Sequence, residues 1–133
     1  MPGHDHVGLA VGDLDVVAGF YGEAFGLTEV VEEFVMPDAG VRSRILRSAG
    51  GVQLELVERA GSTPQRFSDP FDGAGTQGWF HWALRVPSLD EAFDVALTAG
   101  ATVVSAPADG VRAGMRFAYV ADPEGNLVEL LEA

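Results

Sequence analysis

Two glutamates occupy the same place in two similar β-like stretches. Glu55 lies in Gly-Val-Gln-Leu-Glu-Leu-Val-Glu at 51–58, and Glu129 lies in Gly-Asn-Leu-Val-Glu-Leu-Leu-Glu at 125–132, 74 residues later. Each of them is flanked by aliphatic residues, and a carboxylate directed at a buried face must be protonated, paired or bound to a metal. The pattern therefore indicates chemistry at both positions and suggests an internal repeat.

Each copy of this repeat also carries one histidine. His6 and His81 are both followed by Leu at the third position and Val at the fifth, and they lie 75 residues apart. The four residues His6, Glu55, His81 and Glu129 make a mixed nitrogen and oxygen set that suits Fe(II), Co, Ni, Mn or Zn and not a thiolate-preferring ion. An octahedral ion held by all four would keep two positions for water or substrate.

A purely structural reading of these residue types stays open. A histidine on a strand is usually a hydrogen-bonded structural residue, and a glutamate on a strand usually faces solvent. We assign that solvated role to Glu58 and Glu132, the second glutamate of each stretch. His4 shares a strand face with His6 but has no counterpart in the second copy, so we interpret it as a terminal residue and not a ligand.

The first copy reads as a βαβββ module over about residues 4–59. Alternating small and aliphatic residues predict a strand up to Val11, and Asp13 predicts the start of a helix that ends at Gly26. Strands at 28–36 and 41–48 are expected around a Pro-Asp-Ala-Gly turn, and a last strand carries Glu55.

The second copy reads the same way over about residues 79–132. Trp79 opens a strand, Ser88-x-x-Glu91 is a capping box, and the helix that follows stops at Gly100. Strands are expected at 101–106, 114–121 and 126–132. The Gly-, Ser-, Pro- and Asp-rich segment 60–78 connects the copies, and its Phe67 and Phe71 are expected to pack on the body or to cover a cavity.

The predicted fold is α+β, in one domain of residues 1–133. Two tandem βαβββ modules would put their helices outside and curve a mixed sheet around a central metal-binding trough. All four candidate ligands would project into this trough if the modules are related by a pseudo-two-fold axis.

Bulk composition excludes several classes of function. The formal charge of −12 argues against nucleic acid as a partner, and the absence of Cys excludes disulfides and thiolate chemistry. No apolar run is long enough to span a bilayer and no signal-peptide pattern opens the chain, so we expect no membrane partner and a cytoplasmic location.

The chain resembles the vicinal oxygen chelate superfamily, which includes glyoxalase I, methylmalonyl-CoA epimerase, extradiol dioxygenases, and fosfomycin- and bleomycin-resistance proteins. The motifs that carry the resemblance cover essentially the whole chain. They are His-Val-Gly-Leu-Ala-Val at 6–11, Phe-Tyr at 20–21 with Phe-Gly-Leu at 25–27, Leu-Glu-Leu at 54–56, His-Trp-Ala-Leu at 81–84, and Asp-Pro-Glu-Gly-Asn at 122–126 running into Val-Glu-Leu at 128–130.

The resemblance implies a metal-dependent lyase, isomerase or epimerase. In glyoxalase I-like members the metal ligands are the residues matching His6, Glu55, His81 and Glu129. Such an enzyme removes a proton next to the metal-bound carbonyl of a small molecule or thioester, and Glu129 is the first candidate for the base, with Glu55 as its symmetric alternative. A homodimer is also implied, in which a site is formed within one chain or across the interface.

Two alternatives and the choice of substrate stay open. The same superfamily contains Fe(II)-dependent ring-cleaving dioxygenases and metal-free proteins that sequester an antibiotic. Glyoxalase I proteins usually carry an Arg four residues after the first His and an Asn four residues after the first Glu, both used on glutathione. Here those positions are Ala10 and Arg59, which argues against a glutathione adduct. The stretch from His81 to Arg85 resembles methylmalonyl-CoA epimerases, so a CoA thioester stays possible.

Overall fold

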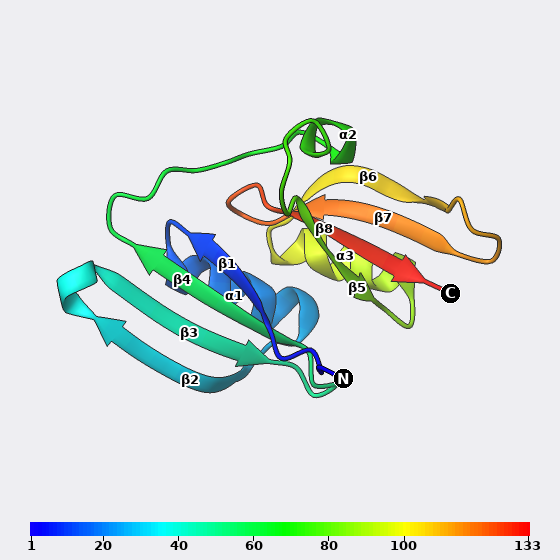
Figure 1. The fold of residues 1–133 in the computed structure, drawn as a ribbon. Coiled ribbons are helices and arrows are strands. Elements are labelled where there is room, and N and C mark those ends of the chain that lie inside the picture. The colour runs from blue at the N-terminus through cyan, green and yellow to red at the C-terminus, as the bar shows by residue number, and fades with distance from the viewer. The chain divides into compact units, whose positions relative to one another are not determined.

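The computed structural model describes all residues from 1 to 133 and divides them into two compact units. Unit 1 is Met1–Pro64 and unit 2 is Gln65–Ala133, so the boundary falls inside the predicted connection. Each unit contains a four-stranded sheet of its own (Figure 1). The expectation of one domain with a central trough concerns how the units are placed, and it stays a prediction.

Unit 1 has the predicted βαβββ order. Its elements are β1 (Val7–Val11), α1 (Leu14–Phe25), β2 (Glu29–Met36), the 3-10 turn η1 (Pro37–Ala39), β3 (Val41–Arg47) and β4 (Gln53–Arg59). The strands lie in the order β1-β4-β3-β2, with β1 parallel to β4 and the other neighbours antiparallel. The parallel pair places the first and last strands of the module side by side.

The helix α1 begins and ends where the sequence predicts. The Asp13 carboxylate accepts a hydrogen bond from the Val16 N–H at 3.1 Å, and Gly26 ends the helix at a φ of 72°, a conformation that favours glycine. The apolar side of α1 packs on the sheet, where Leu54 and Leu56 of β4 are 1% and 0% exposed. The core of unit 1 therefore lies between α1 and one face of its sheet.

Unit 2 repeats this arrangement after a short additional helix. Its elements are α2 (Pro70–Gly73), β5 (His81–Arg85), α3 (Leu89–Ala99), β6 (Thr102–Asp109), β7 (Arg116–Ala121) and β8 (Leu127–Glu132). The strand order is β5-β8-β7-β6, again with the first and last strands of the module parallel. The second βαβββ module is thus confirmed, with β6 extending three residues beyond its predicted end.

The helix α2 is not predicted from the sequence because it is a single turn inside a Gly- and Pro-rich segment. Asp69 caps it by accepting the Asp72 N–H at 2.8 Å, and Pro70 stands at its first position. Phe71 is 88% exposed, so the expectation that it packs on the body is wrong. Gly73 instead lies against Phe80, whose Cδ2 would be only 2.6 Å from a Cβ at this position.

The roles predicted for Glu58 and Glu132 are wrong, since both carboxylates cap a helix. Glu58 accepts the Leu14 N–H at the start of α1 at 2.8 Å, and Glu132 accepts the Leu89 N–H at the start of α3. Ser88 makes no side-chain capping bond, so the expected capping box is absent too. A carboxylate on the last strand satisfies the free N–H groups of the helix and complements its dipole.

Arginines reinforce this link between helix and sheet in both units, and in unit 1 Arg44 joins Arg42 in pairing with Asp15, at 3.1 Å. Arg42 lies 3.4 Å from Asp15 and 3.6 Å from Glu58, and Arg116 lies 3.2 Å from Asp90. The two units share these residues because the sequence repeats them, as Ala-Gly-x-Arg at 39–42 and 113–116 and as Leu-Asp at 14–15 and 89–90.

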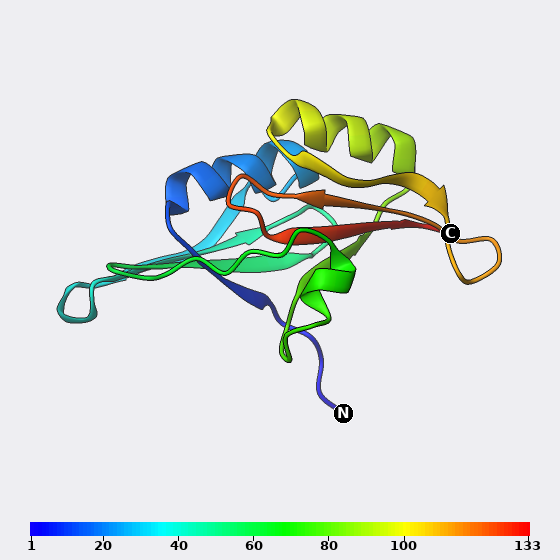
Figure 2. The same ribbon diagram turned by 90° about the horizontal axis from the view of Figure 1, so that it is seen from above.

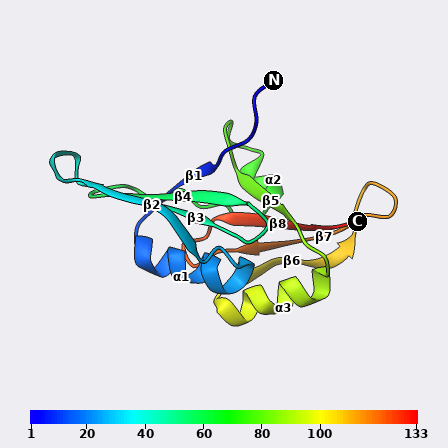
Figure 3. The ribbon, with the colours of Figure 1, turned by 90° about the horizontal axis from the view of Figure 1, so that it is seen from below.

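Each sheet has one face covered by a helix and one face without. Figures 2 and 3 show α1 along one face of the sheet of unit 1 and α3 along one face of the sheet of unit 2. We call the other face of each sheet its open face. Strand alternation places His6, Gly8, Ala10 and Glu55 on the open face of unit 1. No helix of the chain is both long and apolar enough to cross a membrane.

Candidate metal centre

The open face of unit 1 brings one histidine and one glutamate together. His6 directly precedes β1, and Glu55 lies in β4 opposite Gly8, the residue two positions after His6. The His6 Nε2 atom lies 3.4 Å from Glu55 Oε1, and the two side chains are 33% and 21% exposed. Because Gly8 has no side chain, the space above the parallel pair stays open to the Glu55 carboxylate.

Unit 2 forms the same pair at the equivalent positions. His81 begins β5, and Glu129 lies in β8 opposite Ala83, again two residues after the histidine. The distance from His81 Nε2 to Glu129 Oε1 is 3.3 Å, and the side chains are 24% and 19% exposed. Each unit therefore places its own histidine beside its own glutamate.

The spacing of each pair suits two ligands of one metal ion. Donor atoms about 2.1 Å from an ion, at octahedral or tetrahedral angles to each other, lie about 3.0–3.4 Å apart. Within neither unit do three or more His, Asp or Glu side chains gather into a metal-binding group. Each unit thus supplies two donors, and His6, Glu55, His81 and Glu129 would have to combine to supply four.

The second oxygen of Glu55 and the carboxylate of Glu129 have different partners. The Ser43 hydroxyl on β3 donates to Glu55 Oε2 at 2.7 Å, and this serine is only 1% exposed. On β7, Tyr119 lies opposite Glu129. Burial, followed by the nearby Glu129 charge, raises the pKa of Tyr119 to about 12, so its phenol stays a neutral donor.

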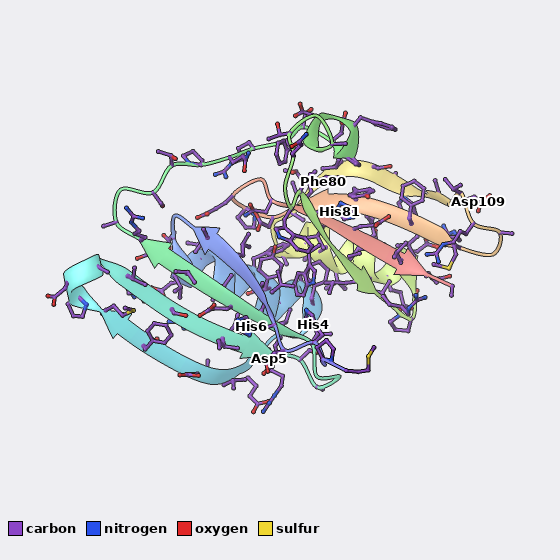
Figure 4. All side chains as sticks on the ribbon, viewed as in Figure 1. His4, Asp5, His6, Phe80, His81 and Asp109 are labelled. Atoms are coloured by element: carbon purple, nitrogen blue, oxygen red, sulfur yellow. The ribbon has the colours of Figure 1, made fainter.

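The surroundings of the two histidines also differ (Figure 4). The Asp5 carboxylate lies 2.6 Å from His6 Nδ1, and this hydrogen bond, more than the Glu55 charge, raises the pKa of His6 above 6.5. His81 instead lies between aromatic rings, 4.5 Å from Phe80 and 5.4 Å from Tyr119 between ring centroids. Its Nδ1 atom is buried without a hydrogen-bond partner.

Asp5, Ser43 and Tyr119 were not identified as site residues from the sequence. Only Tyr119 had a usable signal, because it lies among apolar residues of the predicted strand that directly precedes the strand of Glu129. The contact of Ser43 with Glu55 depends on strand register, and the contact of Asp5 with His6 depends on the path of the N-terminus. Residue spacing specifies neither of them.

Comparison with known proteins identifies the family. A model of the Glyoxalase/Bleomycin resistance protein/Dioxygenase superfamily matches residues 3–130. The chain belongs to this superfamily. No curated protein sequence matches the chain.

Solved structures of the superfamily share the fold. A glyoxalase family protein from Enterococcus faecalis has a TM-score of 0.80 at 20% identity, covering 98% of this chain and 97% of that one. Glyoxalase I from Zea mays has a TM-score of 0.76 at 22% identity and covers 97% of this chain, which spans only 44% of the maize protein. The fosfomycin resistance protein FosX from Listeria monocytogenes, solved with Mn(II) and sulfate, has a TM-score of 0.70 at 20% identity over 100% and 93% of the two chains.

Proposed function

We propose that this protein is a metal-dependent lyase or isomerase that moves a proton next to a carbonyl group of a small-molecule or thioester substrate. The observation that carries the proposal is the His Nε2 to Glu Oε1 contact that occurs once in each unit, at 3.4 and 3.3 Å. A structural role would not require both residue types at both equivalent positions, whereas a shared metal ion would.

The ligands in this proposal are His6, Glu55, His81 and Glu129, acting together on one divalent ion such as Ni, Co, Zn, Mn or Fe. The Mn(II) in the Listeria resistance protein supports a metal in this superfamily. A bound ion would act as a Lewis acid that makes the C–H next to a substrate carbonyl more acidic.

The residues of the chain would supply the base and its orientation. Glu129 is our first candidate to accept the proton, and Glu55 is the alternative. The hydrogen bond from Ser43 limits the rotation of the Glu55 carboxylate, and Tyr119 lies opposite Glu129 on the neighbouring strand. A base held in this way can return the proton to the neighbouring carbon or to the opposite face of the substrate.

A homodimer is part of the proposal. The edge strand β2 exposes several large apolar side chains, including Val35 at 61% and Met36 at 52%. Edge strands with exposed apolar residues favour association with another chain. The two halves of a site would then come from one chain or from two.

The decisive experiment is turnover in deuterated water with the metal-loaded protein. Glutathione hemithioacetals and CoA thioesters with an acidic α-hydrogen are suitable substrates for the screen. We expect deuterium at the reacting carbon, and equal rates with and without oxygen. Oxygen consumption matched to product would instead indicate a ring-cleaving dioxygenase. Ligand binding that survives metal removal, without any turnover, would indicate a sequestering protein.

A further inference from the structure

The arginines on the strands differ in whether they have an acidic partner. Four of them form ion pairs with Asp or Glu, namely Arg42, Arg44, Arg47 and Arg116. Arg59 and Arg85 form none, although the chain contains 20 acidic residues. An exposed cation without a partner in so acidic a protein is available to bind an anionic group from outside.

Arg85 lies on the open face of unit 2, the face that carries the His81–Glu129 pair. His81, Ala83 and Arg85 alternate along β5, whose pairing with β8 is continuous from His81 to Arg85. β5 lies beside β8 in the ribbon as well (Figure 1). The guanidinium therefore rises from the same side of the sheet as the candidate metal ligands.

The distance to Glu129 suits a short substrate. Ala83 is opposite Glu129, and Arg85 is opposite Leu131, two residues further along β8. From the usual strand rise and spacing, the Cα atoms of Arg85 and Glu129 are about 8 Å apart. Glu129 directs Oε1 at His81 and makes no ion pair with Arg85, so the arginine is left for another carboxylate.

The repeat itself shows that this arginine is not needed by the fold. The position equivalent to Arg85 in unit 1 is Ala10, also four residues after its histidine. Unit 1 forms its parallel strand pair with an alanine at this position, and unit 2 forms the same strand pair with an arginine. Arg59 is a weaker candidate, because it lies four residues past Glu55, at the exposed end of β4.

We propose that Arg85 binds a carboxylate of the substrate, and that the substrate is therefore a carbonyl or hydroxy compound with a second, free carboxylate a few bonds from the reacting carbon. This inference rests on the proposed function, since it places the reacting carbon at the His81–Glu129 pair. A single guanidinium matches the charge and planar geometry of one carboxylate and can bind it through two hydrogen bonds.

The test compares lactate with malate, two 2-hydroxy acids that differ by one carboxylate. Calorimetric titration of the full chain, first zinc-loaded and then after chelation, should give about tenfold tighter binding of malate. Arg85→Ala should abolish this preference and Arg85→Lys should keep part of it. Arg112→Ala, which removes the same charge from the exposed 110–115 loop, should leave it unchanged.

Four results would overturn the inference. They are equal affinity for both acids, no measurable malate binding, a preference that survives Arg85→Ala, and a larger Arg85-dependent gain for 3-phosphoglycerate than for malate. Failure of the protein to hold any of the divalent ions named above would remove the proposed function, but the malate preference of the chelated protein would still test Arg85. Unfolding midpoints should match among the variants because Arg85 is exposed.

Discussion

The Glu58 carboxylate accepts a hydrogen bond from the Leu14 N–H at 2.8 Å, across 44 residues of sequence. Glu55, three residues earlier on the same strand, lies on the opposite face beside His6. The two glutamates of one short motif therefore have separate roles, because neighbouring odd and even positions of a strand face opposite sides. The same division holds for Glu129 and Glu132 in unit 2.

Replacing Glu58 by Ala should reduce stability without affecting metal binding. Loss of a helix cap costs about 1 kcal/mol of the free energy of unfolding, and urea denaturation would measure it. Glu55→Ala should have the reverse effect, with metal content lost and the unfolding of the metal-free protein little changed. Metal loss in Glu58→Ala at unchanged stability would contradict the assignment of both residues.

Replacing either histidine of the pairs should release the metal. We expect His6→Ala and His81→Ala to lower the metal content of the purified protein sharply, because each removes one of four ligands, while circular dichroism stays unchanged. His4→Ala is the matched control, since His4 has no counterpart in unit 2 and should leave the metal bound. Full occupancy in both His6→Ala and His81→Ala would refute the proposed centre.

Removing the Ser43 hydroxyl should weaken metal binding through Glu55. Ser43→Ala leaves Glu55 Oε2 without its donor at 2.7 Å, and loss of such a supporting hydrogen bond typically lowers metal affinity about 10–100-fold. Competition with a fluorescent chelator would measure the change. The exposed Ser62→Ala is the control, and equal affinities of these two variants would show that Ser43 does not orient the ligand.

The pKa of His6 in the metal-free protein should depend on Asp5. The Asp5 hydrogen bond raises this pKa above 6.5, so Asp5→Asn should lower it, as followed by NMR titration of the ring protons. Because the folded-state pKa is the higher one, the stability from this pair is fully present below pH 6.5 and is lost as the pH rises through the folded value. An unchanged titration curve in Asp5→Asn would exclude the contact.

Much of this protein could be predicted from residue order alone. The βαβββ modules and the choice of His6, Glu55, His81 and Glu129 as candidate residues follow from an internal repeat and strand alternation, which are local and periodic. The start of α1 at Asp13 and its end at Gly26 follow from cap chemistry, which is equally local.

Other features required the three-dimensional structure because they depend on register between distant strands. Glu58 and Glu132 resemble solvated residues until the fold carries them to helix N-termini, where Glu58 adds to the Asp13 cap of α1 and Glu132 replaces the cap of α3 expected from Ser88. Whether an arginine is paired likewise depends on which residues face it across the sheet. Arg42 pairs with Asp15, which lies 27 residues earlier in α1. Arg85 faces no carboxylate that would neutralise its charge. Residue spacing does not encode this difference.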